Sequence, residues 1–66
     1  MKKYKVVDLY DGKDVLGYAD TKQEIKRLAN ERIDDTDGEC DIYVLTLDPE
    51  VNKYRIKSLK SYKEII

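Results

Sequence analysis

Several residue types that carry chemistry in small proteins are absent from this chain. It contains no histidine, tryptophan or phenylalanine, and only one cysteine and one proline. The lack of histidine removes the commonest general base and metal ligand, and no motif for catalysis, metal binding or nucleotide binding stands in its place. A pair of carboxylates could still catalyse hydrolysis, but 66 residues leave little concave volume for a substrate. We therefore expect no enzyme activity, no catalytic residue, no metal and no cofactor.

The chain also has little that would direct it to a membrane or to an oxidising compartment. The single cysteine, Cys40, cannot form an internal disulfide, and we interpret it as a small buried apolar residue that opens a strand. No signal-peptide pattern is present, and no apolar run approaches the roughly 20 residues that span a bilayer. These features predict a soluble, cytoplasmic protein without a membrane partner.

The net charge is close to zero although 41% of the residues are charged, because 13 lysines and arginines nearly balance 14 acidic residues. Overall charge therefore favours neither nucleic acid nor a membrane surface as partner. Apolar residues also make up 41% of the chain and fall in periodic blocks, which is typical of a folded protein. We predict one small domain of marginal stability over residues 1–66.

The first third of the chain predicts a β-hairpin. Residues 3–10 alternate so that both faces of a strand carry apolar side chains, and Asp11 and Gly12 mark a tight turn. A second strand follows at residues 14–19. Its glycine, Gly17, indicates a bulge or a close approach of another segment to the backbone.

Residues 21–33 predict an amphipathic helix. Thr21 and Glu24 fit a capping box, in which the two side chains satisfy backbone N–H groups at the helix start. Four apolar residues recur at helical spacing and form one stripe that should pack on a sheet: Ile25, Leu28, Ala29 and Ile33. A polar loop at residues 34–39, with Gly38 able to adopt a positive φ, is expected to end the helix.

The second half predicts another pair of strands. Residues 40–47 form the most strand-like segment and should be the central strand, residues 48–52 supply turn chemistry, and residues 53–59 return as a strand. Residues 61–66 predict one helical turn or an extension that docks on the domain. The predicted fold is therefore α+β in the order ββαββ, with an antiparallel sheet and one helix packed on one face.

The strands predict a binding surface, because one helix can cover only one face of a sheet whose strands are apolar on both. Six tyrosines are the only aromatic residues, and the preference of tyrosine for strands accounts for at least half of them. Tyr43 and Tyr54 are our candidate binding residues on the sheet, since aromatic residues are enriched at interfaces. In the return strand, Tyr54 and Ile56 should point inward or toward a partner.

The segment at residues 34–41 carries five carboxylates. It does not fit a calcium loop, because Gly38 at the sixth position would put Ile33 and Val44 where carboxylates are required. An ordinary solvated loop is one interpretation. The other is a negative patch that meets a basic partner surface, with three candidate binding residues: Asp35, Asp37 and Glu39.

In size and composition the chain resembles the small accessory proteins of bacteriophages and other mobile elements, which are often tiny α+β domains rich in Lys, Asp, Glu and Tyr and without catalytic motifs. This resemblance implies binding to a host or defence protein in order to block or redirect it. It rests on no shared motif, so it assigns no role to any residue.

Our first hypothesis is accordingly a protein-binding module, itself a homodimer, that binds its partner through the sheet face or the acidic loop. The alternative is a single-stranded nucleic-acid binder, in which the sheet tyrosines act with Lys5, Arg55 and Lys57. Lys5 lies in the first predicted strand, and Arg55 and Lys57 lie in the last. These cations would form one basic surface if the two strands were neighbours in the sheet. A subunit that only self-associates is the third hypothesis.

Overall fold

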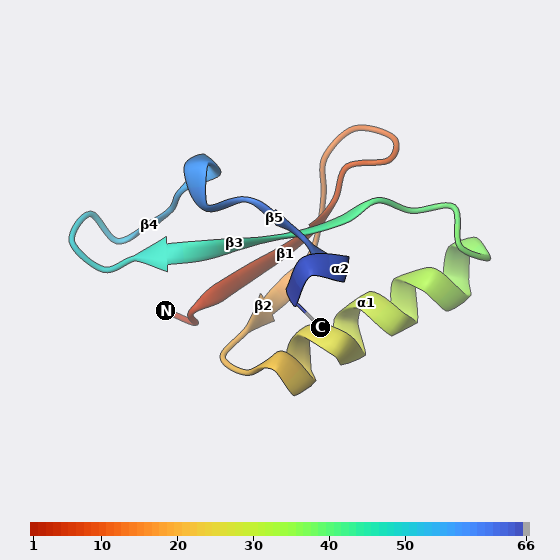
Figure 1. Ribbon diagram of the computed structural model, residues 1–66, viewed down its shortest axis with the longest axis horizontal. Helices are drawn as coiled ribbons and strands as arrows, with labels where there is room; N and C mark the ends of the chain where they lie inside the picture. Colours follow the sequence, from red (N-terminus) through yellow and green to blue (C-terminus); the bar gives the residue numbers. More distant parts are fainter. Residues whose placement is uncertain (66) are drawn as a thin grey trace.

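A computed structural model describes residues 1–65 and shows an antiparallel sheet with one long helix packed on one face (Figure 1). The elements in chain order are β1 (Tyr4–Asp8), β2 (Asp14–Ala19), α1 (Lys22–Thr36), β3 (Ile42–Asp48), β4 (Lys53–Tyr54), the 3-10 turn η1 (Ile56–Ser58), β5 (Lys60–Ser61) and α2 (Tyr62–Ile65). The predicted α+β class and the rough order ββαββ are confirmed. In this part of the chain, no helix combines the length and apolar character needed to cross a bilayer.

The strand order is β2-β1-β3-β4, and β5 also pairs with β3. β4 pairs with one end of β3, at Leu47 and Asp48, and β5 pairs nearer the other end, at Tyr43 and Val44. β3 is therefore central, as predicted, with β1 on one edge and the β4–β5 segment along the other.

The core lies between α1 and one face of the sheet. Its buried residues come from both layers and from α2: Val6, Ala19, Ile25, Ala29, Ile42, Val44 and Tyr62. Ile65 of α2 packs against this cluster, which confirms that the apolar end of the chain docks on the domain. Ile66, the last residue of the predicted terminal segment, lies outside the described residues.

The hairpin formed by β1 and β2 contains the irregularity that Gly17 predicts. The pairing register shifts between Val6 and Val7, because Leu16 of β2 is the extra residue of a bulge next to Gly17. Gly17 has φ 154°, and a Cβ atom placed on it would lie 3.0 Å from a methyl carbon of Leu28 in α1. The glycine thus allows the helix to approach the strand closely.

The N-terminus of α1 is confirmed, but its predicted C-terminus is wrong. The Thr21 hydroxyl accepts from the Glu24 N–H at 3.2 Å, and the Glu24 carboxylate in turn accepts from the Asp20 N–H. The helix continues to Thr36, so the first part of the predicted polar loop is helical. The helix ends at Asp37 in the left-handed region, and Gly38 donates to the carbonyl of Ile33 at 2.9 Å.

The predicted start of the central strand also needs correction, because Cys40 precedes β3 and does not belong to it. Its side chain is half-buried against the core. At the other end of the chain, the predicted return strand over residues 53–59 is wrong in its middle. Tyr54 pairs with Leu47 and Lys60 pairs with Val44, so five residues of the return segment lie opposite only two residues of β3. The segment therefore cannot pair continuously with β3, and its middle forms the turn η1.

The face of the sheet away from α1 is partly buried within the chain itself. Val7 and Leu45 lie on that face, and they are only 1% and 5% exposed. The rings of Tyr18 on β2 and Tyr54 on β4 lie 5.5 Å apart on the same face. In a flat sheet these strands would be about 14 Å apart, so the sheet curls over its own second face. A partner is therefore not required to bury Val7 and Leu45.

Candidate functional site

The structure places the three predicted acidic binding residues at one end of the molecule, all of them exposed. Asp35 is in the last turn of α1, Asp37 follows it in the left-handed region, and Glu39 lies in the connection to β3. Two more acids reach this end, Asp11 from the β1–β2 turn and Asp14 from the start of β2, and they line a hollow together with Arg32 and Glu39. We define the acidic end as seven exposed carboxylates: Asp11, Asp14, Asp34, Asp35, Asp37, Glu39 and Asp41.

Asp11 and Asp14 were not among the predicted binding residues, because their position depends on the pairing of β1 with β3, which local sequence patterns do not reveal. β1 runs antiparallel to β3 in direct contact, so the turn after β1 must lie beside the segment before β3. A hydrogen bond of 2.9 Å from the Leu9 N–H to the carbonyl of Asp41 joins the two segments. Their acids therefore share one end of the sheet.

Asp8 fixes this end of the molecule. Its buried carboxylate accepts from the N–H groups of Tyr10 and Asp41 at 3.0 and 2.9 Å, and from Arg32 Nε of α1 at 2.8 Å. Arg32 also pairs with Asp14. Burial by itself raises the pKa of Asp8, but the hydrogen bonds from Arg32 and the two backbone groups outweigh burial, so the pKa lies below its ordinary value of 3.8. Asp8 is thus ionised and holds the turn, the helix and the connection together.

The acidic residues around the C-terminal end of α1 interact unfavourably with the helix dipole. The C-terminal end of a helix carries partial negative charge, where acidic side chains are unfavourable and basic ones are favoured. The last turn of α1 has no basic residue, yet Asp34 and Asp35 lie in it and Asp37 follows directly. Among residues 1–65, Asp35, Asp37 and Glu39 take part in no ion pair. Their charges are therefore available to another molecule.

The two predicted tyrosines lie on the face away from α1 but do not form one patch. Tyr43 is half-buried and pairs with Val7, whereas Tyr54 pairs with Leu47 about 13 Å further along β3. The Tyr54 hydroxyl donates to the carbonyl of Lys2 at 2.6 Å. Burial raises the pKa of Tyr54, with smaller contributions from Tyr18 and Asp20. Tyr54 therefore has a structural role, because its ring contacts Tyr18 and its hydroxyl binds the backbone of Lys2 where the sheet curls over this face.

The exposed member of the ring pair is Tyr18, which sequence reasoning did not single out. Its side chain is 46% exposed and lies on the same face as its pairing partner Lys5. The other cations of the nucleic-acid hypothesis are elsewhere. β3 separates β1 from β4, Arg55 pairs with Asp48, and Lys57 is in η1. The first and last of these strands are not neighbours, so the adjacency that would have given the hypothesis its basic surface is absent from residues 1–65.

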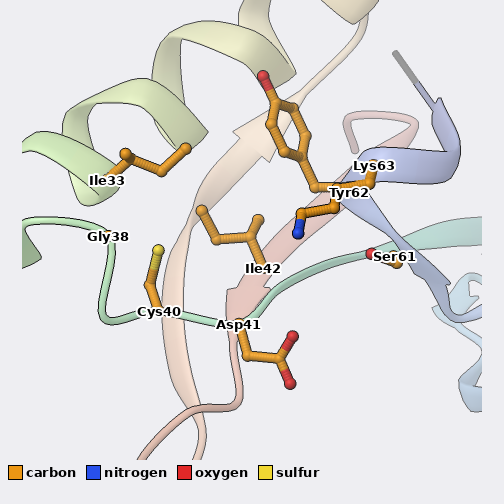
Figure 2. A pocket seen from close by; sticks show the side chains of 8 residues that line it. All are labelled: Ile33, Gly38, Cys40, Asp41, Ile42, Ser61, Tyr62 and Lys63. Atoms are coloured by element: carbon orange, nitrogen blue, oxygen red, sulfur yellow. The ribbon is translucent and has the colours of Figure 1, made fainter.

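A pocket of about 220 Å³ opens between the end of α1, the start of β3 and α2 (Figure 2). Apolar side chains form much of its lining: Ile33, Cys40, Ile42 and Tyr62. Asp41, Ser61 and Lys63 supply its polar part. Such a lining suits an apolar side chain better than a charged ligand.

Within residues 1–65, no three or more His, Cys, Asp or Glu side chains are grouped so that they could hold a metal ion. The acidic end and the apolar pocket lie beside each other, because the connection from α1 to β3 contributes to both. In comparisons with known proteins, no family model, no curated protein and no solved structure matches this chain.

Proposed function

We propose that this chain is a small protein-binding module whose acidic end docks on a basic surface of a partner protein. The observation that carries the proposal is the convergence of seven exposed carboxylates from two segments that are far apart in the sequence, residues 11–14 and 34–41. Asp8 and Arg32 hold these segments in fixed relation. A rigid negative surface speeds encounter with a basic partner and selects against acidic ones.

The placement of the charges at the end of α1 supports the same proposal. Each acid in the last turn of a helix costs about 0.3–1 kcal/mol at an exposed site, and Asp35 and Asp37 have no ion-pair partner within residues 1–65 that offsets this. A basic partner would offset the cost on binding. A module of this kind acts by occupying its partner's surface, which fits an inhibitor or modulator of a host or defence protein, as in bacteriophages.

The test is capture of partners from a nuclease-treated bacterial lysate with two matched variants. The first carries Asp35→Asn, Asp37→Asn and Glu39→Gln, which remove three charges without removing any side-chain hydrogen bond of residues 1–65. The second carries Glu50→Gln and Glu64→Gln, two exposed acids outside the acidic end. Mass spectrometry should show one protein that is retained by the wild type and by the second variant and is lost by the first.

The proposal also predicts how retention depends on salt. Capture should weaken as the salt concentration rises, because exposed charges are screened within about 8–10 Å at physiological ionic strength. Equal retention of the same partner by the charge-neutralised variant at low salt would contradict the proposal.

A second candidate function is binding of single-stranded nucleic acid, which is favoured by one observation. Tyr18 presents an exposed ring beside Tyr54, on the face that also carries Lys5. Base stacking on such a ring contributes about 1–3 kcal/mol per base. Binding of a labelled oligonucleotide that is lost in Tyr18→Ala and is unaffected by neutralising Asp35, Asp37 and Glu39 would favour this function over the first.

A further inference from the structure

The turn η1 presents an isoleucine to solvent on a braced support. The Ser58 hydroxyl donates to the carbonyl of Arg55 at 2.6 Å and accepts from the Thr46 N–H of β3 at 2.9 Å. The Arg55 N–H donates to the Thr46 carbonyl at 3.3 Å, and the Leu59 N–H donates to the carbonyl of Ile56. These bonds satisfy the backbone of the interrupted edge and leave Ile56 74% exposed at its tip.

The pocket beside the acidic end has the size and lining to receive such a side chain. Figure 2 shows the Cys40 thiol and the Ile42 side chain directed toward the space between Ile33 and Tyr62. A dry cavity of about 150 Å³ holds benzene, so a pocket of about 220 Å³ admits the four carbons of an isoleucine side chain. Ile42 and Tyr62 belong to the core, so the floor of the pocket is fixed.

The surroundings of the two features carry opposite charge. Residues 53–60, which contain η1, have four lysines and arginines and no acid, and one of the four, Arg55, is paired with Asp48. Residues 34–41, which line or flank the pocket, contain five acids and no base. Lys63 is the exception, because it is a cation that lines the pocket. Charge complementarity therefore favours approach of the η1 edge of one molecule to the pocket of another.

We propose that Ile56 of one copy of this chain inserts into the pocket of a second copy. The contact joins two different surfaces, so it is heterologous, and each copy still offers a free isoleucine at one side and a free pocket at the other. Association then continues head to tail and produces rings or open chains in place of a twofold dimer. This inference goes beyond the proposed function, since it requires no other protein.

Sedimentation velocity over a range of protein concentrations at low salt tests the contact. The wild type should show a mass that rises with concentration and falls on addition of salt. Ile56→Asp should weaken association at least about tenfold, because burial of an isoleucine contributes about 1.5–3 kcal/mol. Val51→Asp is the matched control, since Val51 is also exposed, at 44%, but lies in the β3–β4 turn; it should associate like the wild type.

A mixing experiment tests the head-to-tail geometry. Alkylation of Cys40, the only thiol, with a bulky maleimide blocks the pocket and leaves Ile56 intact. Ile56→Asp and the alkylated protein should each remain monomeric alone, but their mixture should form a one-to-one dimer that grows no further. Monomeric wild type at every concentration, association of Ile56→Asp equal to wild type, or a mixture without dimer would each overturn the proposal.

Alkylation of Cys40 could also prevent association by unfolding the protein. A variant that is expected to associate more strongly than the wild type avoids this ambiguity. Lys63→Gln removes the cation on the pocket that repels the approaching basic edge. It should therefore strengthen association at low salt, with an unchanged circular dichroism spectrum. Weaker or unchanged association of Lys63→Gln would count against the charge argument and the docking mode together.

Discussion

The face of the sheet that carries Val6 and Val44 is covered by α1, whereas the face that carries Val7 and Leu45 is covered by the curl of the sheet itself. The first face meets a separate layer of side chains from the helix. The second has only its own neighbours, with the Tyr18–Tyr54 contact joining strands from the two ends of the strand order. A strand with two apolar faces therefore does not need a separate layer on each side, because a strongly curled sheet can bury part of its own surface.

The largest expected effect comes from opening the face covered by the helix. Ile25 is fully buried between α1 and the sheet, and Ile25→Ala should lower the free energy of unfolding by about 4 kcal/mol through lost burial and a remaining cavity. In a chain of 66 residues this is a large part of the total stability. Urea unfolding followed by circular dichroism measures the loss. A change below about 1 kcal/mol would contradict the tight packing of this face.

Asp8→Asn should have the next largest effect, about 3 kcal/mol, because it removes the ionised partner of Arg32 and of two backbone groups at the end where the helix joins the sheet. The pKa of Asp8 is lower in the fold than its ordinary value of 3.8, so its contribution is fully present above that pH and is lost as the pH falls below it. Unfolding measured from neutral to acidic pH should therefore show wild type and variant converging in acid. A constant difference at all pH values would be inconsistent with this role.

Leu45→Ala tests the face that the sheet covers by itself. Leu45 is 5% exposed, and we expect a loss of about 2 kcal/mol, below that of Ile25 because no second layer is disrupted. Val15→Ala on the same face is the control, since Val15 is 48% exposed and should change stability by about 0.5 kcal/mol or less. If both variants gave the same small change in urea unfolding, the second face would be open in solution.

The smallest predicted effect concerns the contact that closes the second face. Tyr54→Phe keeps the ring beside Tyr18 but removes the hydroxyl that donates to the carbonyl of Lys2, which should cost about 1 kcal/mol. Urea unfolding followed by circular dichroism measures this loss. A change well below about 0.5 kcal/mol would show that the hydroxyl does not help to hold this face closed.

Sequence reasoning predicted those parts of the fold that depend on neighbouring residues. The hairpin, the Thr21 cap and the irregularity at Gly17 each follow from local turn, capping or glycine chemistry, and each is present. The order ββαββ follows from the same local signals. The end of α1 was predicted too early because its exposed polar residues continue the helix as well as they would form a loop.

The parts that sequence reasoning missed depend on contacts between distant segments. The alternation of residues 53–59 is typical of a strand, but the Ser58 hydroxyl bonded to Thr46 replaces strand pairing there and turns Ile56 outward. For the candidate site, Asp35, Asp37 and Glu39 could be chosen from their clustering in the sequence. Asp11 and Asp14 could be added only after the pairing of β1 with β3 was known.

The pairing of β1 on both sides has a consequence for synthesis of the chain. β1 is near the N-terminus, yet it lies between β2 and β3, so one of its edges is paired early and the other must wait for residues 42–48. At translation rates of 5–20 residues per second, that wait lasts on the order of a few seconds. During this interval the nascent hairpin exposes the apolar edge that later forms the centre of the sheet. The newly made protein is therefore most vulnerable to misassociation before its second half leaves the ribosome.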